Sequence, residues 1–91
     1  MRLVWSPRAR SDREDAIDYI AADNPAAALQ QFDEIEGATD RLVEHPQLGR
    51  ADRVKGTREL VIPRTQFIAI YRVAGDAVQI LRILHGAQQW P

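Results

Sequence analysis

Two pairs of a polar residue and a proline constrain the fold of this 91-residue chain more than any other feature of its sequence. Ser6-Pro7 follows the short apolar run 3–5, and Asn24-Pro25 repeats the pattern further along. In each pair the polar side chain can cap a helix, and proline suits the first helical turn because its missing N–H has no intrahelical partner there. The sequence therefore predicts a strand that leads into a first helix, and a second helix that starts where the first one ends.

Apolar residues recur with helical spacing in both predicted helices, the first over residues 8–22 and the second about twenty residues long. The His45-Pro46 step and Gly49 are expected to end the second helix. The tight link makes the two helices an antiparallel hairpin. The apolar stripe of the second helix is heptad-like but lasts under three heptads. This favours packing on the chain's own sheet over a coiled coil. The stripes are Ala9, Ala16, Ile17 and Ile20, then Ala28, Phe32, Ile35, Thr39 and Leu42.

The second half of the chain has the pattern of strands. A basic, turn-rich connection over residues 50–56 leads into three segments rich in branched and aromatic residues, 57–62, 67–73 and 78–85. Because the links between them are short, consecutive strands should be antiparallel. We predict a single α+β domain over residues 1–91 with the order β-α-α-β-β-β, in which an antiparallel sheet packs against the N-terminal helical hairpin.

A two-residue turn at Gly75-Asp76 would pair the last two strands and divide their side chains between two largely apolar faces. The sequence does not decide which face the helices cover. The predicted faces are Ile68, Ile70, Arg72, Gln79, Leu81, Ile83 and His85 on one side, and Phe67, Ala69, Tyr71, Val73, Val78, Ile80, Arg82 and Leu84 on the other.

Composition excludes several classes of function. The chain has no cysteine, so it has neither a disulfide nor a thiolate nucleophile, and its two histidines stand far apart. The glycines are scattered, which argues against a phosphate-binding loop or a serine-hydrolase motif. No uncharged stretch approaches the roughly 18 residues of a membrane span. We expect a cytoplasmic protein with no cofactor, no metal ion and no membrane partner.

The near-neutral net charge of −1 conceals an asymmetry between the two halves of the chain. Residues 1–49 carry ten acids and five bases, whereas residues 50–91 carry three acids and seven bases. The basic half could face a polyanion or an acidic protein segment, or the two halves could pair their charges across one fold. A sequence pI of about 6.1 makes binding to free nucleic acid a poor third option.

Candidate functional residues gather in the basic half. Strand-borne arginines hold fixed positions and suit phosphates or partner carboxylates, although Arg58 and Arg72 could instead pair with sheet neighbours such as Glu59. His85 could be a general acid or base, or a structural residue at a strand end. Trp90 could fold back on the core or anchor a partner. The candidates are Arg58, Glu59, Arg64, Arg72, Arg82, His85, Gln88 and Trp90.

The order of short motifs along nearly the whole chain resembles the RelE/ParE toxin superfamily. No single tripeptide is specific, but the number of landmarks in one order at family length makes the resemblance strong. It implies the toxin of a bacterial type II toxin–antitoxin pair, often described as a plasmid-stabilisation protein, in a hetero-oligomer with a cognate antitoxin. The landmarks are Trp5-Ser6-Pro7, Tyr19-Ile20-Ala21, Asn24-Pro25-Ala26-Ala27, Glu44-His45-Pro46 with Gly49-Arg50, residues 54–61, Ile70-Tyr71-Arg72-Val73 and Ile83-Leu84-His85-Gly86.

Members of the superfamily that this chain resembles act on two different targets. RelE-like members cut messenger RNA on the ribosome, and ParE-like members poison DNA gyrase. The nuclease branch typically has an arginine in the strand that here reads Ile68-Ala69-Ile70-Tyr71, and further bases or a tyrosine where this chain ends Gln88-Gln89-Trp90. The ParE-like reading is therefore favoured, with no catalytic residue and a target- or antitoxin-binding set of Arg58, Arg64, Arg82, Gln88 and Trp90. The alternative is an endoribonuclease acting through His85, Arg82, Arg72 and Glu59.

Overall fold

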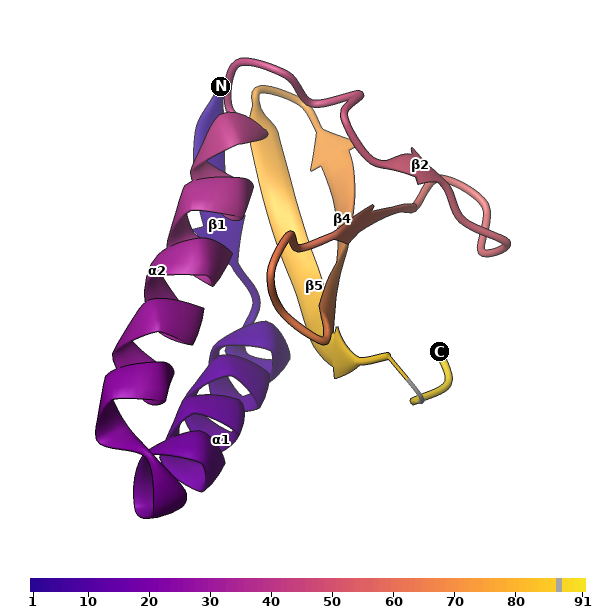
Figure 1. The fold of residues 1–91 in the computed structure, drawn as a ribbon. Helices are drawn as coiled ribbons and strands as arrows, with labels where there is room; N and C mark the ends of the chain where they lie inside the picture. Colours follow the sequence, from indigo (N-terminus) through magenta and orange to yellow (C-terminus); the bar gives the residue numbers. More distant parts are fainter. Residues whose placement is uncertain (87) are drawn as a thin grey trace.

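The computed structural model describes residues 1–86 and 88–91, and its elements follow the predicted order. They are β1 (Arg2–Trp5), α1 (Pro7–Asp23), α2 (Pro25–Arg41), β2 (Arg50–Ala51), β3 (Arg58–Val61), β4 (Phe67–Ala74) and β5 (Ala77–His85). The strands form one sheet in the order β1-β5-β4-β3-β2, and the helical hairpin lies along one side of it (Figure 1). The predicted α+β architecture is confirmed.

Both predicted helix starts are capped as the sequence indicates. The Ser6 Oγ accepts a hydrogen bond from the Ala9 N–H at 3.0 Å, and the Asn24 Oδ1 accepts one from the Ala27 N–H at 3.1 Å. A proline stands at the first turn of each helix. The second helix ends at Arg41, a turn earlier than expected, and irregular turns carry the chain on to Gly49.

The sheet is mixed rather than purely antiparallel. β3, β4 and β5 pair antiparallel as predicted, with Gly75 and Asp76 in the turn between β4 and β5. β1 pairs parallel with β5, and the helices and strands between them in sequence provide the long connection that a parallel pair requires. The connection predicted over residues 50–56 contains the short strand β2, which pairs with the first half of β3.

A β-bulge in β5 reverses part of the predicted face assignment. Tyr71 is opposite Ile80, but Ile70 is opposite Arg82, so Leu81 is an extra residue in β5. The face prediction holds as far as Ile80 and is wrong for the residues after it. Downstream of the bulge Ile83 and His85 share the face of Phe67, Ala69 and Tyr71, and Arg82 and Leu84 lie opposite Ile70 and Ile68.

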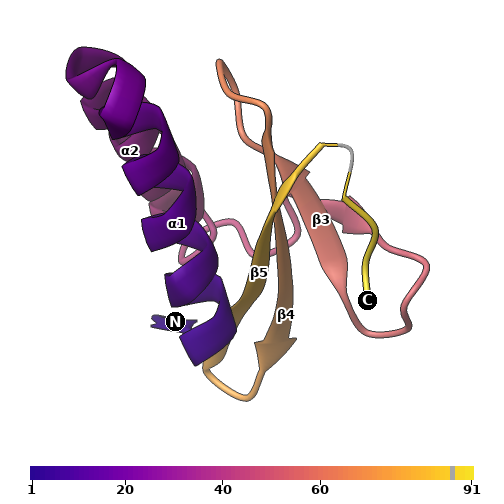
Figure 2. The same ribbon diagram turned by 90° about the horizontal axis from the view of Figure 1, so that it is seen from below.

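The helices cover the face of the sheet that carries Tyr71. Its apolar side chains pack with those of the helices into one core that comprises Ala9, Ile35, Ala38, Leu42, Leu60, Ile62, Phe67, Ala69, Tyr71, Val78, Ile80 and Ile83. Arg13 joins three elements at the rim, because its guanidinium lies 4.3 Å from the Trp5 ring centroid and 5.5 Å from that of Phe32. Both described helices lie on the side of the sheet that carries Tyr71, and the last residues of the chain run across the opposite side, called the open face here (Figure 2).

Neither described helix is long and apolar enough to cross a membrane.

Candidate functional site

A large hollow lies between the helical hairpin and the far end of the sheet. This hairpin groove has a volume of about 1060 Å³. It is lined by α1, the first half of α2, the β3–β4 loop and the end of β5, with Phe67 and Ile83 among its lining residues. Of the candidate residues, it brings together Arg64, Arg82, His85 and Gln88. Tyr19 also lines it and is 84% exposed.

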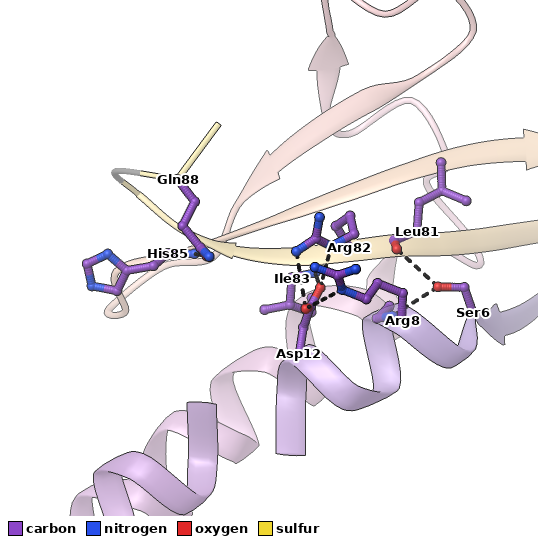
Figure 3. A network of polar contacts seen from close by, with 9 residues as sticks. Ser6, Arg8, Asp12, Leu81, Arg82, Ile83, His85 and Gln88 are labelled. Carbon is purple, nitrogen blue, oxygen red and sulfur yellow. Dashed lines mark hydrogen bonds and ion pairs between the residues drawn. The ribbon is translucent and has the colours of Figure 1, made fainter. Parts of the chain in front are cut away.

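Arg82 is held by Asp12 of α1. Its Nε donates to the Asp12 Oδ2 at 2.7 Å, and the same oxygen accepts the Ile83 N–H at 3.0 Å. The Ser6 Oγ donates to the Leu81 carbonyl at 3.0 Å. These contacts give hydrogen-bond partners to the backbone of β5 beyond Ile80, the last residue that pairs with β1 (Figure 3). The Arg82 side chain is only 15% exposed and its charge is compensated, so its first role is structural.

His85 and Gln88 are also engaged with their neighbours. The His85 Nε2 lies 2.6 Å from the Gln66 Oε1, and its ring meets the edge of Phe67 with centroids 6.0 Å apart. The His85 N–H donates to the Gln88 Oε1 at 2.7 Å, and the Gln88 N–H donates to the His85 carbonyl at 2.9 Å. Both side chains are thus held by contacts within the fold.

Arg64 fastens the β3–β4 loop to α2. Its guanidinium pairs with Glu34 at 2.7 Å, and its carbonyl accepts the Gln31 Nε2–H at 3.3 Å. The hydrogen bond from Arg64 to Glu34, supported by the carboxylate charge, raises the pKa of the Arg64 guanidinium. Arg64 has a φ of 62°, in the left-handed region that rarely holds a residue with a side chain. The tie to α2 compensates for this backbone strain.

The other predicted site residues lie away from the hairpin groove. Arg58 donates to the Gly49 carbonyl at 2.8 Å, and Glu59 forms an ion pair with Arg50 of β2. Arg72 donates to the Gln79 Oε1 at 2.7 Å across the hairpin of β4 and β5. Each of these three side chains is thus paired within the sheet or with the loop beside it. For Arg72 this agrees with the alternative in which the strand arginines pair with sheet neighbours.

The loop before β2 is anchored by a buried tyrosine that the sequence did not single out. The Tyr71 hydroxyl donates to the Pro46 carbonyl at 2.8 Å and accepts the Gly49 N–H at 2.8 Å. Burial raises the pKa of the Tyr71 phenol, while the Gly49 N–H and the positive charge of Arg58 oppose that rise. Tyr71 and Arg58 together fix the loop that brings β2 onto the sheet.

Trp90 folds back onto the open face. It lines a second hollow of about 490 Å³, the open-face groove, together with Ile68, Ile70 and Leu84. Glu59 and Gln88 line it as well. Trp90 is half-buried there, and its contact with a partner stays a prediction.

Two residues at these sites escaped prediction from the sequence. Asp12 lies within the first predicted helix, and Gln66 lies between two predicted strands. Asp12 meets Arg82 across 70 positions of sequence, and Gln66 meets His85 across 19. No local spacing signals either contact, since each depends on how α1 and the β3–β4 loop lie against the end of β5.

Comparisons with known proteins agree with this architecture. The pattern of the ParE toxin of the type II toxin–antitoxin system parDE matches residues 3–90. Y4kP of Sinorhizobium fredii, which is named as a toxin, is 41% identical over 90 residues, 99% of this chain and 93% of that protein. Toxin RelE2 of Caulobacter vibrioides is 33% identical over 87 residues, 96% of this chain and 97% of that protein.

A solved structure of the chromosomal ParDE TA system from P. aeruginosa superposes with a TM-score of 0.84 at 33% identity, covering 93% of this chain and 95% of that one. The fold and the sequence thus support the same assignment, and the resemblance seen in the short motifs is confirmed. The chain belongs to the ParE toxin family of type II toxin–antitoxin systems, within the RelE/ParE superfamily.

Proposed function

We propose that this chain inhibits DNA gyrase by binding to it, and that a cognate antitoxin neutralises it. Membership of the ParE family supports the toxin role, and the solved relative is described as part of a ParDE system. A binding protein of this kind needs a stable, accessible surface rather than a set of convergent catalytic groups.

The observation that carries the proposal is the dispersal of the residues a nuclease would need. Cleavage of RNA requires a base, an acid and cations around one phosphate. His85 and Arg82 line the hairpin groove, whereas Glu59 lines the open-face groove and Arg72 lines neither. The bulge at Leu81 contributes to this separation, because it turns His85 toward Phe67.

The ion pairs made by Arg82 and Glu59 also argue against a nuclease. Arg82 is neutralised by Asp12, and Glu59 is engaged by Arg50. A phosphate would have to displace a carboxylate from Arg82, and Glu59 would have to give up an ion pair before it could accept a proton. These pairs favour a role in binding over a role in catalysis.

We assign the antitoxin to the hairpin groove. Its apolar surface comes from half-buried Ala16 and Ile20 of α1, and Arg8 at its edge is exposed to an acidic segment. Arg64 also lines it, and although it pairs with Glu34 its side chain remains 66% exposed. A segment that folds as it binds can wrap such a mixed surface and gain affinity from both kinds of contact. Exposed Tyr19 at the side of the groove is suited to pack on the apolar side chains of that segment.

Pulse labelling of new DNA and new protein after expression of this chain alone tests the target. We expect DNA synthesis to fall first while translation continues, and purified gyrase to lose supercoiling activity when the purified chain is added. Coexpression of the antitoxin should restore DNA synthesis in the cells, and added antitoxin should restore the supercoiling activity of purified gyrase. Translation that collapses before DNA synthesis, together with unaffected gyrase, would show that the target is the ribosome and that the chain is a messenger RNA endonuclease.

A further inference from the structure

Arg8 brings an available positive charge to the α1 wall of the hairpin groove. Two guanidinium groups, those of Arg8 and Arg82, share the single carboxylate of Asp12 there (Figure 3). Arg82 donates to this carboxylate at 2.7 Å and the Ile83 N–H donates to it at 3.0 Å, whereas the Arg8 Nε lies 3.5 Å away. The Arg8 side chain is also 68% exposed, against 15% for Arg82. Asp12 is thus committed to Arg82, and the charge of Arg8 is free to meet a partner.

Asp15 brings the opposite charge to the same wall. It is exposed, it lines the hairpin groove, and it forms no ion pair within residues 1–86 and 88–91. Asp15 follows Arg8 by about two full turns of α1, so the two residues lie on one side of the helix, with a rise of about 10.5 Å between them. The groove therefore presents two charges of opposite sign in a fixed order, and half-buried Ala16 and Ile20 lie beyond Asp15.

We propose that these two charges form a register that selects the antitoxin. Arg8 binds a carboxylate of the bound segment, Asp15 binds a lysine or arginine of the same segment, and apolar side chains of the segment pack beyond Asp15 on Ala16 and Ile20. A segment with the two charges in the reverse order is repelled at both positions, so the register distinguishes segments of equal net charge. The inference rests on the proposed function, because it takes the antitoxin as the occupant of the hairpin groove.

The spacing of the two charges favours a helical segment as the partner. In a helix, side chains two turns apart share one side and are separated by about 10.5 Å, which matches the rise from Arg8 to Asp15. In an extended strand, about three residues span the same length, but the side chains at the two ends of that span point to opposite faces. The bound segment should therefore carry an acidic and a basic side chain two helical turns apart, with its apolar side chains beyond the basic one.

A charge exchange along α1 tests the register separately from the net charge of the chain. Arg8→Glu and Asp15→Lys should each weaken binding of the purified cognate antitoxin about tenfold in titration calorimetry. The double variant has the net charge of the unsubstituted chain, yet it should bind about 100-fold more weakly, because both contacts are then repulsive. Arg8→Gln removes the charge without placing a second acid beside Asp12, and it should weaken binding less than Arg8→Glu. Thermal unfolding checks that every variant is folded.

A matched exchange outside the hairpin groove is the control. Arg10 and Glu14 are exposed on α1 and do not line the groove, so the double variant Arg10→Glu/Glu14→Lys should change the affinity less than about twofold. Equal affinity of the Arg8/Asp15 exchange and the unsubstituted chain would overturn the register and leave the proposed function standing. An equally large loss in the control exchange would also overturn it. If the unsubstituted chain does not bind the antitoxin, the proposed function fails and the register fails with it.

Discussion

Gly49 is the position where a single added methyl group should damage the fold most. A Cβ there would lie 2.6 Å from the Glu59 carbonyl oxygen and 2.7 Å from the Tyr71 Cε1, and neither group can move without disturbing the sheet. We expect Gly49→Ala to lower the free energy of unfolding by about 1–3 kcal/mol, the range of an overpacked core. Urea denaturation of the purified chain measures this change.

Gly37 supplies the matched control. It lies within α2, and an added Cβ would meet no atom within 4 Å. Gly37→Ala should therefore raise the free energy of unfolding by about 0.5–1 kcal/mol, because alanine is favoured over glycine inside a helix. The two identical substitutions are expected to have opposite signs, and a shared sign would refute the steric explanation for Gly49.

Tyr71 should make stability fall at alkaline pH. Burial raises the pKa of its phenol in the folded chain, whereas in the unfolded chain the group ionises near pH 10. The unfolded state therefore loses its proton first, and the free energy of unfolding decreases as the pH rises above about 10. Below that pH the contribution of Tyr71 is constant.

Urea denaturation between pH 8.5 and 11 checks this prediction against Tyr71→Phe. The variant should be less stable at pH 8.5 by about 1–3 kcal/mol, because the Pro46 carbonyl and the Gly49 N–H lose their common partner. It should also show a smaller decrease in stability toward pH 11. An equal decrease in both proteins would mean that other groups cause the alkaline loss.

At the scale of elements, the sequence predicted most of the features that depend on neighbouring residues, such as the helix starts and the tight turn. The caps Ser6 and Asn24 marked the helix starts, and the Gly75-Asp76 turn set the pairing of β4 with β5 near that turn. The bulge at Leu81 could not be predicted, because it is stabilised by Ser6 and Asp12 of a distant segment. Since a bulge reverses the side-chain alternation, this one residue changed which candidate site residues share a face.

The helical hairpin carries two exposed apolar side chains that separate groove binding from general surface hydrophobicity. Tyr19 lines the hairpin groove, and Leu29, which is 69% exposed, does not. If the antitoxin occupies that groove, Tyr19→Ala should weaken antitoxin binding about tenfold. Leu29→Ala should change it less than about twofold. Titration calorimetry with the purified antitoxin measures both, and a larger loss for Leu29→Ala would place the antitoxin outside the groove.

At the scale of the whole molecule, the opposite charges of the two halves of the chain are partly joined by the fold. Asp12 pairs with Arg82, Glu34 with Arg64, and Asp76 with Arg2, so three ion pairs connect the N-terminal and C-terminal halves. The basic half is therefore less available to a polyanion than its composition suggested. The charges of the hairpin and of the sheet act first within the molecule, which fits a protein that binds protein partners rather than free nucleic acid.

Because His85 lies in a different groove from Glu59, we predict that toxicity survives the loss of His85. Removing a general acid or base typically costs a nuclease 10² to 10⁴-fold in activity, roughly enough to abolish growth inhibition. In this fold His85 contacts Gln66 and Phe67, so His85→Ala should cost about 0.5–1.5 kcal/mol of stability and leave growth inhibition within about twofold. His45→Ala, which removes the other histidine from an exposed turn, is the control for expression and handling. Plating after induction compares the three proteins at equal abundance. If His85→Ala alone restores growth while thermal unfolding shows it to be folded, His85 acts in catalysis and the chain is a nuclease, not a gyrase-binding toxin.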